Sequence, residues 1–264
     1  MSFFGKSFIY NLIPSDTFGL FISELDSGAI NRQMGSMPVE IYEQKIFRKP
    51  SPYFFGSSPS AKLKFDFSAH AERDIDADEF QIIQKWLFGS KTYKKFQIVQ
   101  EDIESCYWLA ILNNPQITRV GNLIHGFSAT IECNSPYAFK FPKTTTYNYT
   151  SPDVDSVEVF YNSSDDADSY LYPSLVLTIN TFGGDVSIVN ESDNDREFLF
   201  TGLSAHEVIT MDNGLQTISS STGLKRLGNF NKKFLRLVPG VNNLHITGNI
   251  ETVAMTTQFI AKKI

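Results

Sequence analysis

The feature that most constrains the fold is a strictly alternating run at residues 126–133. Its apolar positions fall on one side of an extended chain and its polar positions on the other: Phe127, Ala129, Ile131 and Cys133 against Ser128, Thr130 and Glu132. Such alternation is typical of a half-buried strand. The run leads directly into Asn134-Ser135-Pro136-Tyr137-Ala138, and a proline cannot donate to a continuing ladder. We therefore predict a strand at the sheet edge of a domain, with the domain boundary just beyond it.

The rest of the first half predicts further strands. Residues 61–68 alternate, with Leu63, Phe65 and Phe67 on the inward side. Four other apolar runs are strand candidates: 39–46, 96–99, 106–112 and 116–120. A turn is expected at 113–115, where Asn-Asn-Pro separates the last two of them.

One helix is expected in the first half. Asp76 can cap it, and Glu79 stands three residues later, as in a capping box. Gly89 marks its end. Between these signals, Ile83 and Leu87 belong to an apolar stripe at helical spacing.

The second half predicts a β-sandwich of the jelly-roll kind. Strand candidates recur at intervals of roughly ten residues, as in all-β domains. They are 157–161, 175–181, 186–190, 197–200, 207–212, 215–219, 234–237, 244–248 and 252–259. Asn213-Gly214 between two apolar runs is a strong hairpin signal. Many short strands with regular turns indicate two packed sheets.

A length of 264 residues fits two domains. We expect domains at 1–140 and 141–264, connected by the stretch 140–156. No apolar run approaches the roughly 20 residues that span a bilayer, and the first residues lack the pattern of a secretion signal. We therefore expect folding in a reducing cytoplasm, with Cys106 and Cys133 as buried thiols.

The net charge of −6 is distributed unevenly. Residues 1–143 hold 15 acidic and 15 basic residues, whereas residues 144–195 hold ten acids and no Lys, Arg or His. A conventional nucleic-acid binder needs a dense basic face, so the sequence argues against that class. We expect the acids of 144–195 to lie on exposed loops that face solvent or a basic partner.

No catalytic, cofactor or metal site is indicated. The four histidines show no zinc-binding spacing, and the acidic clusters at 165–168 and 191–195 lack the glycine and glutamate of a calcium-binding loop. A nucleophile elbow, a phosphate-binding loop and a dinucleotide fingerprint are missing too. We therefore expect no enzymatic activity, no cofactor and no metal.

A proline-rich segment at 47–56 carries the candidate contact residues Tyr53, Phe54 and Phe55. We interpret it as a loop, because it holds too many prolines for a central strand. Three exposed aromatics on a loop are unfavourable unless a surface covers them. That surface is either another subunit or the core of the same domain.

Four stretches, in their order along the chain, carry a resemblance to a known family. They are 62–67 after a Tyr-Phe-Phe-Gly segment, the helix end at 83–87, the run from Tyr107 to Ala138, and the group 186–190, 207–212 and 237–248. With them, the chain resembles the distal tail (Dit) proteins of long-tailed, non-contractile bacteriophages, the siphophages. The resemblance covers nearly the whole chain.

The resemblance implies a mainly β protein with an N-terminal tail-tube-like β-sandwich that has one α-helix and a C-terminal galectin-like jelly roll. It implies a homo-hexameric ring at the distal tip of the virion tail, assembled in the host cytoplasm, that joins the tail tube to the host-adhesion device or baseplate. DNA would pass through its channel without specific binding, and no membrane would be entered. Implied partners are the tail tube protein, the tail hub or tail-associated protein, the tape measure protein and receptor-binding proteins. The alternative is a carbohydrate-binding module or a glycan-active β-sandwich protein.

Overall fold

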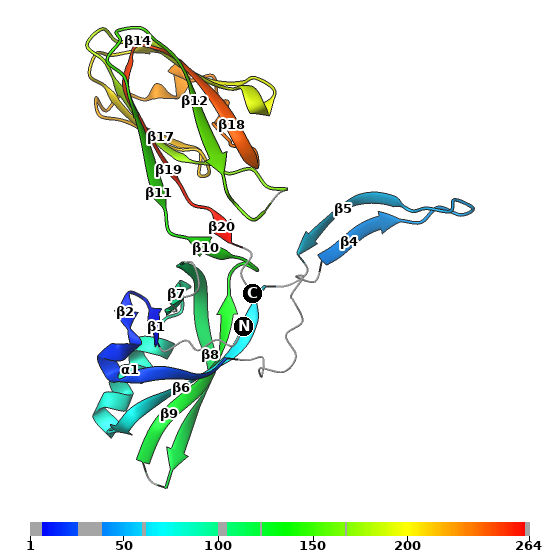
Figure 1. Cartoon of the computed structure of the whole chain (residues 1–264), viewed down its shortest axis with the longest axis vertical. Coiled ribbons are helices and arrows are strands. Elements are labelled where there is room, and N and C mark those ends of the chain that lie inside the picture. The colour runs from blue at the N-terminus through cyan, green and yellow to red at the C-terminus, as the bar shows by residue number, and fades with distance from the viewer. Residues whose placement is uncertain are drawn as a thin grey trace. The chain divides into compact units, whose positions relative to one another are not determined.

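The computed structural model describes residues 7–25, 39–59, 62–99, 105–121, 123–166 and 168–261. They belong to two compact units, one ending at Phe139 and the other spanning Lys140–Ala261 (Figure 1). Strands dominate both units, and α1 (Ala77–Phe88) is the one α-helix of the described ranges. The expectation of a mainly β chain with a single α-helix is confirmed.

An antiparallel sheet forms the body of the first unit, in the order β2-β1-β7-β8-β9-β6-β3. Its strands are β1 (Ser7–Tyr10), β2 (Ile13–Pro14), β3 (Leu20–Leu25), β6 (Lys64–Ile75), β7 (Lys94–Val99), β8 (Cys106–Val120) and β9 (Leu123–Cys133). A short 3-10 helix, η1 (Ser15–Phe18), follows β2. The chain reaches the second unit through β10 (Ala138–Lys140).

The alternating run lies in β9, and its four apolar side chains are buried as predicted. Its expected position at a sheet edge is wrong, because β9 pairs with β8 on one side and with β6 on the other. Gly126 is required there. A Cβ atom at this position would overlap the carbonyl oxygen of Ala69 on β6.

The expected turn at 113–115 is also wrong. β8 continues through it as one strand, and its pairing with β9 shifts register between Asn113 and Gln116. Asn114 has a φ of 52°, the left-handed conformation that asparagine tolerates better than most residues. The Asn-Asn-Pro signal therefore produces a bulge inside a long strand.

The helix forms where the capping signals predict it. The Asp76 carboxylate accepts a hydrogen bond of 2.8 Å from the Glu79 backbone N–H, and the Gly89 N–H donates to the Lys85 carbonyl at 3.1 Å. Ile83 and Leu87 are buried. The Trp86 indole N–H donates to the Tyr10 carbonyl at 2.9 Å, which fixes the helix against β1.

The second unit is a sandwich of two sheets, one ordered β11-β19-β13-β16-β17 and the other β12-β18-β14-β15. Its elements are β11 (Lys143–Asn148), β12 (Val154–Asn162), β13 (Ser174–Ile179), β14 (Gly184–Asn190), η2 (Glu191–Asp193), β15 (Arg196–Leu203), β16 (Val208–Asp212), β17 (Thr217–Ser220), η3 (Arg226–Asn229), β18 (Gly240–Gly248), β19 (Ile250–Thr257) and β20 (Ile260–Ala261). Leu177, Ile188, Phe198, Ile246 and Val253 are among the residues of its core.

Two local expectations for this half fail. The stretch 140–156 is no linker, because β11 occupies much of it and pairs with β19 in the sandwich. Residues 234–237 form no strand and contribute only an isolated bridge between Leu237 and Leu171. The hairpin at Asn213-Gly214 is confirmed, since it joins β16 to β17.

Candidate functional site

The strands β4 (Val39–Gln44) and β5 (Tyr53–Pro59) form a hairpin of their own, and neither pairs with any other described strand. Figure 1 shows it as a long two-stranded ribbon. All residues from 40 to 57 are exposed except Gly56, which is half-buried. The predicted loop at 47–56 is therefore partly a strand, although an isolated one. Such a hairpin is marginally stable at best in water by itself.

The three predicted contact residues lie at the start of β5. The exposed fractions of their side chains are 48% for Tyr53, 66% for Phe54 and 67% for Phe55. The interpretation that they pack into the core of their own domain is therefore wrong. The pairing of the two strands shifts register at Phe55, because Tyr42 pairs with Gly56 and Glu43 pairs with Phe54. Ile41 and Phe47, exposed by 60% and 87%, extend this apolar surface.

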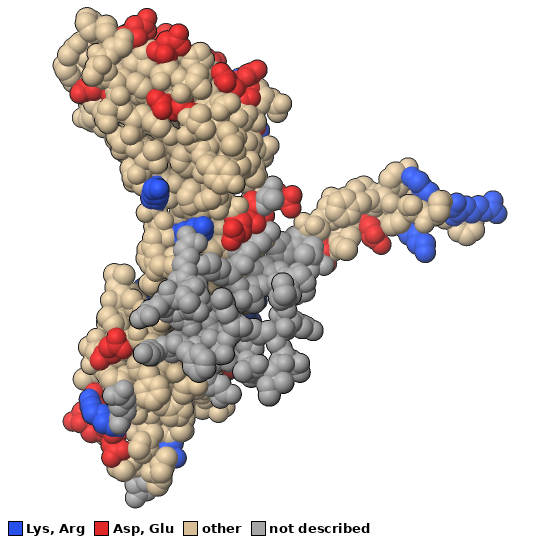
Figure 2. Space-filling view, viewed as in Figure 1, with Lys and Arg blue, Asp and Glu red and all other residues tan. Residues whose placement is uncertain are grey.

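The turn of the hairpin adds positive charge to the aromatic surface. Lys45, Arg48 and Lys49 lie between the two strands, and Figure 2 shows basic side chains gathered at that end of the ribbon. The Lys49 ammonium lies 3.4 Å from the centroid of the Tyr53 ring. A complementary surface would combine apolar and acidic groups.

The described residues contain no group of three or more His, Cys, Asp or Glu side chains that could hold a metal ion. Two of the histidines have carboxylate neighbours: His245 Nε2 lies 2.6 Å from Asp155 Oδ1, and His125 Nε2 lies 3.3 Å from Asp74 Oδ1. Both cysteines are free thiols and buried. Burial raises the pKa of the Cys133 thiol to about 12, so this thiol is protonated and unreactive at neutral pH. Within the described ranges, no helix is long and apolar enough to cross a membrane.

The acidic stretch 144–195 is less uniform than its sequence suggests. Asp193 is buried, and the Arg236 guanidinium binds both of its oxygens, with Nε–Oδ2 at 2.7 Å and Nη2–Oδ1 at 3.0 Å. Asp166 is buried as well. The expectation of exposed loop acids is therefore wrong for these two. Most of the others are exposed: Asp153, Asp155, Asp165, Asp168, Asp185, Glu191 and Asp195. Figure 2 shows acidic side chains spread over the second unit.

A buried ion pair that no sequence pattern indicated joins Glu207 to Arg226 in the second unit. Arg226 Nη2 lies 2.5 Å from Glu207 Oε2, and both side chains are almost completely buried. Burial by itself raises the pKa of the Glu207 carboxyl. Hydrogen bonds from Arg226, from the Ser220 hydroxyl and from the Ser204 backbone N–H outweigh it and lower this pKa to about 2. The pair therefore stays ionised at neutral pH.

Two protein-family models together match almost the whole length of the chain. A model described as "Phage tail protein N-terminal domain" matches residues 3–135, and one described as "Phage tail C-terminal domain" matches residues 137–256. The chain belongs to this family of phage tail proteins. No curated protein sequence matches the chain.

Solved structures show how widely the fold of this phage tail protein is shared. The Dit protein of phage SPP1, called a paradigm of the hub adsorption apparatus in phages that infect Gram-positive bacteria, aligns with a TM-score of 0.68 and 11% identity over 96% of this chain and 98% of its own. Two structures of the phage p2 baseplate in its activated conformation, with Ca and with Sr, align with TM-scores of 0.51 and 0.52. Both do so at 8% identity, over 93% of this chain and 92% of theirs. The phage tail protein therefore has a Dit-like fold.

Proposed function

We propose that this phage tail protein forms a hexameric ring at the distal end of the tail, where it joins the tail tube to the host-adhesion device. The observation that carries the proposal is the β4–β5 hairpin, which exposes five aromatic side chains: Tyr42, Phe47, Tyr53, Phe54 and Phe55. Membership of a phage tail family supports the location. The fold shared with a hub protein of an adsorption apparatus supports the position at the tail tip.

A ring is a natural use for such a hairpin. A closed ring needs a heterologous contact, in which one surface of each subunit binds a different surface of the next. The hairpin supplies the first surface, with Tyr53, Phe54 and Phe55 as its apolar anchors. Burying a large apolar side chain contributes about 1.5–3 kcal/mol. Contact with a neighbour would also stabilise a hairpin that lacks a core of its own.

The proposed role is structural and needs no catalysis. Up to residue 139, the chain carries 15 acidic and 13 basic residues, so a channel built from first units would not bind DNA phosphates tightly. DNA would pass through it without specific binding. The tail tube, tail hub, tape measure and receptor-binding proteins are the proposed partners, and assembly would take place in the host cytoplasm.

Mass measurement in solution, combined with negative-stain electron microscopy of the purified chain, tests the proposal. We expect a species of six times the single-chain mass, with six-fold symmetry and an open centre. Because formation of the ring can require the adjoining tail proteins, the same measurement is repeated in the presence of the tail tube and tail hub proteins of the same phage. Single chains under both conditions would contradict the proposal and favour the alternative, a saccharide-binding or glycan-active protein.

A further inference from the structure

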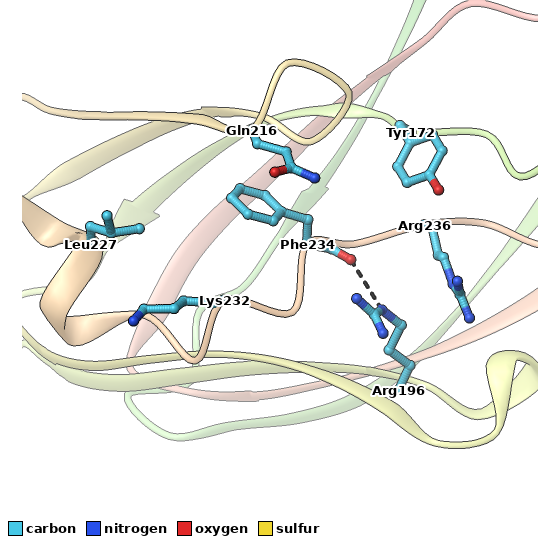
Figure 3. A pocket seen from close by; sticks show the side chains of 7 residues that line it. All are labelled: Tyr172, Arg196, Gln216, Leu227, Lys232, Phe234 and Arg236. Atoms are coloured by element: carbon cyan, nitrogen blue, oxygen red, sulfur yellow. Dashed lines mark hydrogen bonds between the residues drawn. The ribbon is translucent and has the colours of Figure 1, made fainter.

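The second unit contains a pocket that the proposed ring does not use. Its volume is about 450 Å³, within the range of small-ligand sites. Figure 3 shows its seven lining residues: Tyr172, Arg196, Gln216, Leu227, Lys232, Phe234 and Arg236. They come from four separate stretches of the chain: the segment before β13, the start of β15, the β16–β17 turn, and the segment from η3 to β18.

The pocket is positively charged in a unit that is negatively charged as a whole. Residues 140–261 hold 14 acidic and eight basic residues, and three of those eight bases line this one pocket. Asp193 neutralises Arg236. Arg196 uses Nε to donate to the Phe234 carbonyl at 3.2 Å, and neither Arg196 nor Lys232 forms an ion pair with a described side chain. The Arg196 guanidinium is therefore the group best placed to bind a ligand, because the Lys232 side chain points away from it (Figure 3).

Buried polar contacts fix the walls of the pocket. The Asn213 side chain, 1% exposed, donates to the Pro173 carbonyl at 2.6 Å and accepts from the Leu235 N–H at 2.8 Å. Asn213 thus links Pro173, which follows Tyr172, to Leu235, which follows Phe234. Gln216 and Lys232 have φ values of 57° and 62°, left-handed conformations that are uncommon outside glycine and often accompany ligand sites.

We propose that this pocket binds a saccharide that carries a negatively charged group, either a phosphate or a carboxylate. The Arg196 guanidinium would bind the anionic group. The Lys232 side chain extends toward Leu227, away from Arg196, and would attract the ligand from a greater distance (Figure 3). The rings of Tyr172 and Phe234 offer apolar faces to the C–H face of a sugar, and the Gln216 amide can both donate to and accept from hydroxyl groups. The proposal goes beyond the ring and does not depend on it.

Calorimetric titration of the full chain with four small probes tests the proposal. Glucose 6-phosphate and glucuronate represent the two anionic groups, glucose lacks the charge, and inorganic phosphate lacks the sugar. We expect saturable binding of at least one acidic sugar, and the parent glucose should bind at least about tenfold more weakly, the loss expected for a missing charge-assisted hydrogen bond. The stronger acidic sugar identifies the anionic group.

Matched variants locate the binding. Arg196→Gln should weaken binding of the stronger acidic sugar by about tenfold, and Lys232→Gln should weaken it less. Lys233→Gln, at the neighbouring exposed lysine outside the pocket, should leave binding unchanged. Unchanged thermal unfolding establishes that each variant is folded. The proposal is overturned if neither acidic sugar binds, if glucose or inorganic phosphate binds equally well, or if both pocket variants bind like the unaltered chain.

Discussion

Arg226→Met is expected to lower the free energy of unfolding of the second unit by about 3–5 kcal/mol, the usual cost of leaving one member of a buried ion pair without its partner. The Glu207 side chain is fully buried, and Arg226 donates to both of its oxygens. Without Arg226, the carboxylate must either stay buried as an uncompensated charge or take up a proton. Urea denaturation, monitored by far-ultraviolet circular dichroism, measures the decrease in the free energy of unfolding.

A double variant separates the charge effect from the loss of packing. In Glu207→Gln with Arg226→Met, no buried charge remains, and the amide oxygen can still accept from the Ser204 N–H. Replacing both members of a buried pair is often nearly neutral, so most of the stability should return. Arg73→Met, in an exposed pair with Glu79, is the control and should change little. A loss below about 1 kcal/mol in Arg226→Met would show that the pair does not stabilise the unit.

The same pair gives stability a defined pH dependence. Folding lowers the pKa of Glu207 from 4.5 to about 2. The contribution of Glu207 to the free energy of unfolding is therefore fully present above pH 4.5 and is lost as the pH falls toward 2. The shift corresponds to about 3 kcal/mol. The Glu207→Gln variant should lack this part of the acid destabilisation, whereas an identical pH profile in both proteins would contradict the assigned pKa.

Replacing Tyr53, Phe54 and Phe55 together by Ser is expected to convert rings into single chains. If burial of each aromatic contributes about 1.5–3 kcal/mol, the contact between neighbours loses at least about 4.5 kcal/mol, or more than about 10³-fold in association. The domains themselves should stay folded, because these side chains contact no core. Mass measurement in solution gives the number of chains in each particle, and thermal unfolding shows whether the domains are still folded.

The control for the triple variant changes exposed aromatics elsewhere. Tyr161 and Phe182 of the second unit are 64% and 70% exposed, and replacing both by Ser should leave the rings intact. Rings that survive the triple substitution would place the contact on another surface. A triple variant that loses its fold would show that the hairpin supports its own domain.

Local signals in the sequence predicted local structure well. The cap at Asp76 and the alternation in β9 depend on contacts within a few residues or on one buried face, and both occur as expected. The strand at 39–46 was predicted, but the segment 47–56 was predicted as a loop because its prolines argue against a strand, and β5 begins within it at Tyr53. The turn expected at Asn-Asn-Pro was wrong for a related reason. Pairing of β8 with β9 decides whether the chain turns there, and the local residues do not show that pairing.

Sites that are formed by residues far apart along the chain could not be predicted from the sequence. Asp193 meets Arg236 across 43 positions of the chain, and this pairing moves one acid of the predicted exposed cluster into the interior. The pocket is assembled from four stretches that only the sandwich brings together. By contrast, the exposure of Tyr53, Phe54 and Phe55 could be predicted from the sequence, because an aromatic cluster beside prolines fits poorly in a core; their role in a contact between subunits stays a prediction.

Electron cryomicroscopy of tails from virions that carry this chain shows where the protein lies and how many copies surround the tail axis. We expect a six-fold ring at the distal end of the tail tube, with the first unit around an open channel and the β4–β5 hairpin of each subunit against its neighbour. Density for this chain elsewhere in the tail, or as single copies without a surrounding ring, would overturn the proposed function.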